Sequence, residues 1–120
     1  MATRFLIVDD HADFRRLARL ILTDSGYDVV GEAEDIASAR AAALELRPDA
    51  VLLDVRLPDG DGIEIADELA RDAEVVLTST RAARHYGHRL VESAARGFLQ
   101  KQDLTGEAVA ALLSGTPVDH

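Results

Sequence analysis

The chain has 120 residues, a size that fits one domain with one core, and it contains no cysteine, which excludes disulfides and cysteine-based zinc or redox chemistry. Its formal net charge of −9 opposes non-specific binding to nucleic acid and to anionic lipid. We find no apolar stretch of the length of a signal peptide or a membrane span, so we expect a cytoplasmic protein without membrane contact.

The first half of the chain alternates between apolar runs and helical patterns. Residues 4–9 predict a buried strand, and residues 11–26 predict an amphipathic helix because apolar side chains recur three and four positions apart. A shorter strand is expected at residues 27–33. An alanine-rich helix is expected at residues 35–47, where a following proline ends it.

The middle of the chain repeats this alternation around a turn-rich segment. Residues 49–54 predict a second buried strand, and residues 55–62 predict a loop dense in Pro, Gly and Asp. A short helix is expected at residues 63–72, followed by a strand at residues 73–79.

The last third of the chain predicts two more helices around a short strand. The helix at residues 83–96 is the weaker one, because an internal glycine lowers its stability by about 1 kcal/mol. A strand is expected at residues 97–100. The final helix is expected at residues 104–115, with Thr105 as its N-cap and a glycine and a proline in residues 115–117 as its stop.

These five strand–helix units predict the fold class. Continuous apolar strands are typical of a parallel sheet that is covered on both faces. Right-handed crossovers then give a doubly wound α/β fold. Since no repeat or linker interrupts the pattern, we expect residues 1–120 to form a single domain.

Polar residues follow the predicted strands where a ligand of this fold class binds, at the carboxyl ends of the strands. The strand exits carry three acids, two hydroxyls and an ammonium: Asp9 and Asp10, Asp54, Thr78 and Ser79, and Lys101. Lys101 is the single lysine among 13 Lys and Arg residues. Because Lys and Arg differ in shape and hydration, its position at this edge suggests a need for an ammonium group.

Three carboxylates at one edge need positive charge nearby. Two charges about 4 Å apart at an effective dielectric constant near 20 repel by roughly 4 kcal/mol. A hard divalent cation such as Mg²⁺, which binds carboxylates, waters and phosphate oxygens, would offset this repulsion together with Lys101.

Other ligands of this fold class fit the first strand exit poorly. A dinucleotide site needs a glycine-rich turn there, and a flavin phosphate site needs Ser, Thr or Gly, whereas the sequence reads DDHADF. The acids are also adjacent, unlike the DxD pattern of haloacid dehalogenase phosphatases. His11, which follows the acids, is expected to begin the helix rather than to carry a phosphoryl group.

Four motifs resemble those of the bacterial two-component response-regulator receiver domain: LIVDDH, VLLDVRLPDGDG, VVLTS and GFLQK. The resemblance covers essentially the whole chain. It implies a five-stranded parallel sheet in the flavodoxin-like order 2-1-3-4-5 with five helices. One departure is Gln102, which stands where many receivers have proline, so the cis peptide bond expected after Lys101 is lost.

The resemblance also implies the roles of the acids. Asp54 is similar to the phosphoacceptor that takes a phosphoryl group from a kinase phosphohistidine. Asp10 and Asp54 resemble direct Mg²⁺ ligands, Asp9 a ligand through water, and the backbone carbonyl of Arg56 the last protein ligand.

Three further residues complete the implied site. Ser79 resembles the switch hydroxyl that binds a phosphoryl oxygen, with Thr78 as the second choice. Lys101 resembles the ammonium that pairs with the phosphoacceptor and later with the phosphate. Phe98 stands at the aromatic switch position.

The implied activity is Mg²⁺-dependent self-phosphorylation and autodephosphorylation at Asp54, without conventional turnover. The implied partners are a sensor histidine kinase or phosphotransfer protein and a downstream protein that contacts the fourth and fifth helices, with a phosphorylation-dependent dimer as a further expectation. The alternative is a receiver-fold binding module that signals without phosphorylation; a flavin or nucleotide enzyme fits less well. The short tail favours a stand-alone receiver over the front part of a longer regulator.

Overall fold

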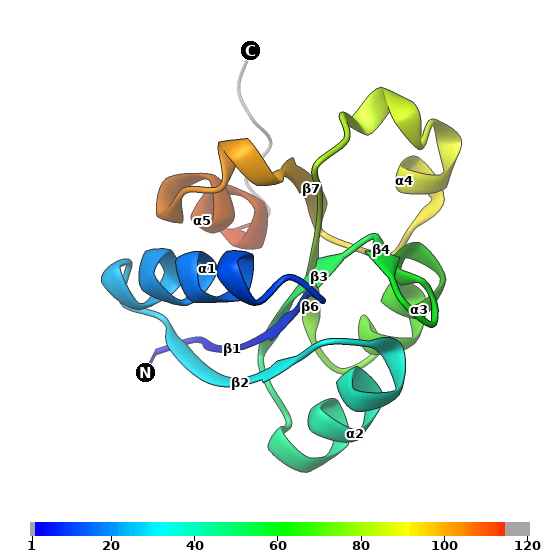
Figure 1. The fold of residues 1–120 in the computed structure, drawn as a ribbon. Coiled ribbons are helices and arrows are strands. Elements are labelled where there is room, and N and C mark those ends of the chain that lie inside the picture. Colours follow the sequence, from blue (N-terminus) through cyan, green and yellow to red (C-terminus); the bar gives the residue numbers. More distant parts are fainter. Residues whose placement is uncertain (1, 115–120) are drawn as a thin grey trace.

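The computed structural model describes residues 2–114, and a parallel five-stranded sheet lies at its centre (Figure 1). The sheet order is β2-β1-β3-β6-β7, which in order of strands along the chain is the predicted 2-1-3-4-5. The five strands are β1 (Arg4–Val8), β2 (Asp28–Ala33), β3 (Ala50–Asp54), β6 (Glu74–Ser79) and β7 (Gly97–Gln100). The doubly wound fold expected from the sequence is therefore confirmed.

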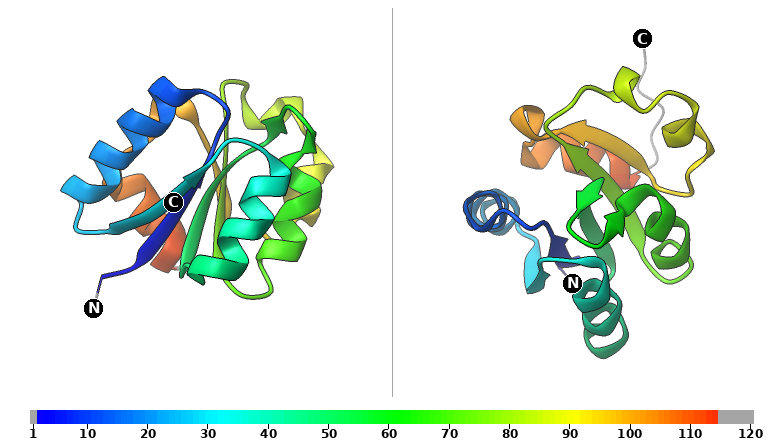
Figure 2. Two further views of the ribbon diagram at one scale, coloured as in Figure 1. Left: turned by 60° about the horizontal axis from the view of Figure 1, so that its bottom comes forward. Right: turned by 45° about the vertical axis from the view of Figure 1, so that its right-hand side comes forward.

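Helices cover both faces of the sheet (Figure 2). The helices are α1 (Ala12–Asp24), α2 (Ile36–Leu46), α3 (Gly62–Leu69), α4 (His88–Glu92) and α5 (Gly106–Ser114). One hydrophobic cluster joins the sheet to α1 and α5, and a second joins it to α2, α3 and the α4 segment. None of the helices within residues 2–114 is long and apolar enough to cross a bilayer.

Strand β1 shows why the buried strands are apolar at every position. Successive side chains of a strand point to opposite faces of the sheet. Phe5 and Ile7 pack in the cluster under α1 and α5, and Leu6 and Val8 pack in the cluster under α2 and α3. All four side chains are almost completely buried, so a polar residue at any of these positions would be buried without a partner.

The predicted loop at residues 55–62 contains a short antiparallel ladder between β4 (Arg56–Leu57) and β5 (Gly60–Asp61), which the sequence pattern did not reveal. Asp61 then caps α3, since its Oδ1 accepts a hydrogen bond from the Ile63 amide at 2.8 Å. A Cβ atom on Gly62 would lie 2.1 Å from the carbonyl oxygen of Asp54, so this position requires glycine. The close approach holds the start of α3 against the exit of β3.

The predicted fourth helix at residues 83–96 is wrong in length. The structure has a single 3-10 turn at Ala83–His85 and then the five-residue α4. Gly87 separates the two pieces with φ of 57°, a left-handed conformation that an α-helix cannot contain. The α4 segment is therefore held by few helical hydrogen bonds of its own.

The last helix begins as predicted, because the Thr105 hydroxyl accepts a hydrogen bond from the Ala108 amide at 3.0 Å. The predicted stop in residues 115–117 lies outside the described residues. Lys101–Asp103 forms a 3-10 turn before this helix, and every peptide bond within residues 2–114, including Lys101–Gln102, is trans.

Candidate functional site

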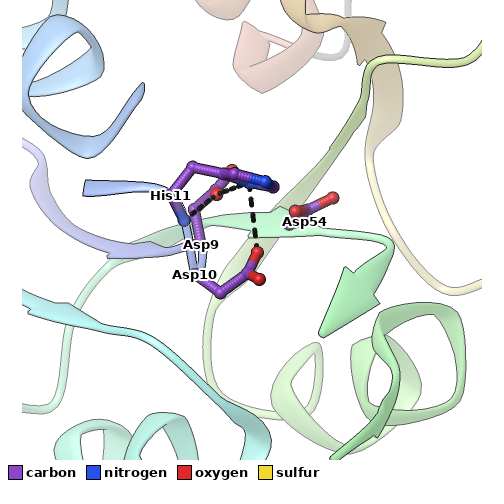
Figure 3. A group of neighbouring side chains, drawn as sticks. All are labelled: Asp9, Asp10, His11 and Asp54. Atoms are coloured by element: carbon purple, nitrogen blue, oxygen red, sulfur yellow. Dashed lines mark hydrogen bonds and ion pairs between the residues drawn. The ribbon is translucent and has the colours of Figure 1, made fainter. Parts of the chain in front are cut away.

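The exits of β1 and β3 bring the predicted acids into one cluster. Four side chains meet there: Asp9, Asp10, His11 and Asp54 (Figure 3). Each offers one possible metal-ligand atom, and these four atoms lie within 4.8 Å of one another. Asp9 and Asp54 are 1% and 3% exposed, whereas Asp10 is open to solvent. The site is therefore half-buried: Asp9 and Asp54 lie at the edge of the core, and Asp10 lies at the surface.

Lys101 supplies the ammonium group of this cluster from the exit of β7. Its Nζ lies 2.6 Å from Asp9 Oδ2 and 3.3 Å from Asp54 Oδ2. The same Nζ lies 4.5 Å from the centroid of the Phe14 ring in α1, a cation–π contact. Phe14 is one of the recurring apolar residues of the predicted helix at residues 11–26, and nothing in that spacing indicated a contact with Lys101. One lysine thus neutralises only one of two buried carboxylates.

Asp54 carries the electrostatic consequence of this arrangement. Burial, and next the negative charge of Asp9, raises the pKa of the Asp54 carboxyl above its usual value. The Lys101 ammonium and the hydrogen bond from the Arg56 amide, at 3.2 Å, oppose this rise. The charged form of Asp54 is therefore under-compensated, and an added cation would stabilise it.

Asp9 and Asp10 differ in how their oxygens are occupied. Asp9 Oδ1 accepts a hydrogen bond from the His11 amide at 2.8 Å and lies 3.0 Å from His11 Nδ1 (Figure 3). The other oxygen of Asp9, Oδ2, contacts Lys101. Among residues 2–114, the Asp10 carboxylate contacts only the His11 ring, at 3.1 Å. His11 takes the N-cap position of α1, as expected. Asp10 thus has the more accessible carboxylate of the two, and its role as a direct metal ligand stays a prediction.

Ser79 and Thr78 occupy different environments at the end of β6. Ser79 lines an open hollow together with Asp10, Asp54 and Lys101. Thr78 pairs across the sheet with Asp54, and its hydroxyl is buried without a hydrogen-bond partner among the described residues. Ser79, and not Thr78, therefore faces the hollow that the acids share.

The Ser79 hydroxyl has two partners in the structure. Its Oγ accepts a hydrogen bond from the Arg81 amide at 3.0 Å and lies 2.6 Å from the Tyr86 hydroxyl. The Tyr86 ring in turn packs against Phe98, with 6.0 Å between the ring centroids. Sequence reasoning missed Tyr86, since a tyrosine inside a weak helical pattern gives no signal of such a contact.

The residues of this hollow fit a hard cation. Carboxylate oxygens are the ligands that Mg²⁺ prefers, and Asp9, Asp10 and Asp54 offer them within a small volume. The predicted carbonyl ligand, Arg56, belongs to β4 at the rim of the same hollow. The cluster of acids therefore offers carboxylate oxygens from which a divalent cation could be held.

Comparison with known proteins decides the family. The sequence model of the response regulator receiver domain matches residues 5–112. The chain belongs to this receiver-domain family. Chemotaxis protein CheY of Thermotoga maritima is 31% identical over 115 residues, a match that covers 93% of this chain and 96% of that protein. The chain is thus a response regulator receiver domain of two-component signalling.

Other relatives are longer than this receiver domain. Response regulator GacA of Pseudomonas viridiflava is 34% identical over 113 residues, which cover 91% of this chain and 53% of GacA. The signal receiver domain of NarL from Mycobacterium tuberculosis superposes with a TM-score of 0.83 at 32% identity, over 94% of each chain. The chain therefore spans nearly the whole of some relatives and about half of others.

Proposed function

We propose that residues 1–120 form one phosphoacceptor receiver domain, in which Asp54 takes a phosphoryl group from a kinase phosphohistidine. The observation that carries this proposal is the shared hollow of Asp54, Asp10, Ser79 and Lys101 at the strand exits. An Asp54 carboxylate oxygen would attack phosphorus as the P–N bond breaks, and the released imidazole nitrogen takes up a proton. The product is an acyl phosphate on Asp54, which water later hydrolyses.

The acids of the site would hold Mg²⁺ during this transfer. Asp10 and Asp54 would be direct ligands with the Arg56 carbonyl, and Asp9 would act through water, because its oxygens already contact His11 and Lys101. The bound cation would neutralise charge on the phosphoryl oxygens. The raised pKa of Asp54 supports this assignment, since its charged form lacks sufficient positive charge nearby.

Lys101 and Ser79 would stabilise the transferred group. The Lys101 ammonium, which lies 3.3 Å from Asp54 Oδ2, would pair with a phosphoryl oxygen once Asp54 is phosphorylated. The Ser79 hydroxyl would donate to another phosphoryl oxygen. These contacts would pull on the exit of β6, and through Phe98 and the α4 segment they would alter the surface around α4 and α5.

The proposed partners follow from this surface and from the charge of the chain. A sensor histidine kinase or a phosphotransfer protein would supply the phosphoryl group in the cytoplasm, and a downstream protein, or a second copy of the phosphorylated chain, would bind near α4 and α5. One relative is the DNA-binding transcriptional activator DevR/DosR of Mycobacterium tuberculosis. The match covers 31% of the length of that protein. With a net charge of −9, this chain would not itself bind nucleic acid.

Incubation with acetyl phosphate, a small phosphodonor, tests the proposal. Intact-mass measurement should show the addition of one phosphoryl group that requires Mg²⁺ and is abolished by Asp54→Asn. Asp72→Asn, which changes an exposed aspartate outside the site, is the matched control and should label like the parent. Binding of Mg²⁺ without any labelling would instead support the alternative, a receiver-fold binding module that signals without phosphorylation.

A further inference from the structure

We propose that Tyr86 is a positioning residue that directs the Ser79 hydroxyl toward the phosphoryl group. This role rests on the proposed function and adds a residue to it. The observation behind it is the 2.6 Å contact between the Tyr86 hydroxyl and Ser79 Oγ, at the rim of the hollow that contains Asp54.

The hydrogen-bonding capacity of Ser79 gives the contact its meaning. A serine hydroxyl has one proton to donate and two lone pairs that accept. The Arg81 amide already donates to Oγ at 3.0 Å. If Tyr86 donates to the second lone pair, both acceptor sites of the Ser79 oxygen are filled. The hydroxyl proton of Ser79 is then left to donate to a phosphoryl oxygen. Tyr86 would thereby fix Ser79 as a donor toward Asp54.

The surroundings of Tyr86 hold its hydroxyl in place for this task. Its ring is half-buried and packs against the hydrophobic cluster under α2 and α3, with Phe98 at 6.0 Å and the His85 ring edge-on at 5.1 Å. A tyrosine has two side-chain torsions, so a packed ring leaves the oxygen little freedom. The packing of the ring against this cluster therefore restricts the position of the Tyr86 oxygen.

Tyr86 also connects the phosphoryl site to the α4 segment. It is the last residue before Gly87, and its carbonyl accepts a hydrogen bond from the Arg89 amide at 3.3 Å. Phe98, at the aromatic switch position, has no hydroxyl and cannot bond to Ser79. In this chain the hydroxyl-bearing aromatic side chain that reaches the switch serine comes from the segment before α4.

Phosphorylation kinetics with acetyl phosphate and Mg²⁺ test the role of Tyr86. Tyr86→Phe removes one oxygen and should slow phosphorylation about three- to tenfold, the effect of losing one neutral hydrogen bond. Tyr27→Phe is the matched control, because the chain has two tyrosines and Tyr27 packs edge-on to Phe5 in the cluster under α1 and α5. This control should phosphorylate at the parent rate.

A double-mutant cycle separates positioning from a merely structural role. In a Ser79→Ala background, Tyr86→Phe should have no further effect on the rate, because the hydroxyl that it directs is gone. An unchanged rate in the single variant, or an equal slowing in the Ser79→Ala background, would overturn the role of Tyr86 while leaving the phosphoacceptor function intact. Absence of labelling in the parent protein would refute both.

A measurement on the Tyr27→Phe variant covers the case in which Tyr86→Phe does not fold. The chain has no tryptophan, so Tyr86 is then the only strong ultraviolet emitter. Beryllium fluoride with Mg²⁺, a phosphoryl analogue, should engage the Ser79 proton and change the emission of Tyr86. Emission that stays constant while the analogue binds would contradict the proposal.

Discussion

Replacing Lys101 by methionine should destabilise the metal-free protein strongly. The ammonium lies 2.6 Å from Asp9 Oδ2 and 3.3 Å from Asp54 Oδ2. At an effective dielectric constant of 20, these attractions are about 6 and about 5 kcal/mol before desolvation is subtracted. Removing one member of a buried ion pair typically costs about 3–5 kcal/mol, because the remaining charge stays buried without a partner. We expect a loss in this range.

Urea unfolding in a chelating buffer at neutral pH measures this loss. Lys101→Arg is the matched control, since it keeps the charge, and it should lose less than the methionine variant. In an Asp9→Asn background the cost of Lys101→Met should shrink, because one of the two carboxylates is neutral. Saturating Mg²⁺ should stabilise the methionine variant more than the parent, since a divalent cation replaces the missing charge. A loss below about 1 kcal/mol, or a loss unaffected by Asp9→Asn, would refute the reasoning.

Two further predictions concern Asp54, the proposed phosphoacceptor. Because the pKa of Asp54 is higher in the folded protein than the usual aspartate pKa of 3.8, protonated Asp54 contributes to stability below pH 3.8. This contribution is lost as the pH rises through the raised pKa of the folded protein. In metal-free buffer, Asp54→Asn should therefore be more stable than the parent at neutral pH, and this difference in stability should disappear on acidification. Thermal unfolding across the pH range measures the difference, and a difference that does not change with pH would contradict the prediction. Gly62→Ala would place a Cβ atom 2.1 Å from the Asp54 carbonyl oxygen, so it should lower the free energy of unfolding by about 1–3 kcal/mol and slow phosphorylation of Asp54. Unchanged phosphorylation would show that the close approach of Gly62 does not position Asp54.

The sequence predicted the sheet well because its signals are local. Runs such as the one ending at Val8 are apolar at every position, which is typical of a strand buried on both faces. The helix at residues 83–96 was overestimated for the opposite reason. Its helical pattern is weak, and Gly87 adopts a left-handed conformation that a periodicity of side chains cannot reveal. The β4–β5 ladder was missed because two-residue strands carry no pattern.

The candidate site could be assembled from the sequence as a set of residues but not as a set of contacts. The exits of parallel strands all lie at one edge of the sheet, and β1 and β3 are neighbours, so their acids were expected to meet there, with the lysine after β7 at the same edge. The sequence by itself therefore determined the fold class, the family and the chemical groups at the edge of the sheet.

Only the tertiary structure decided how those groups are paired. It placed Ser79 rather than Thr78 in the hollow, shared Lys101 between Asp9 and Asp54, and brought Phe14 and Tyr86 to the site. These contacts join residues far apart in the chain or separated by an irregular turn, so they depend on how helices pack on the sheet. Side-chain packing of this kind leaves no periodic signal in a single sequence.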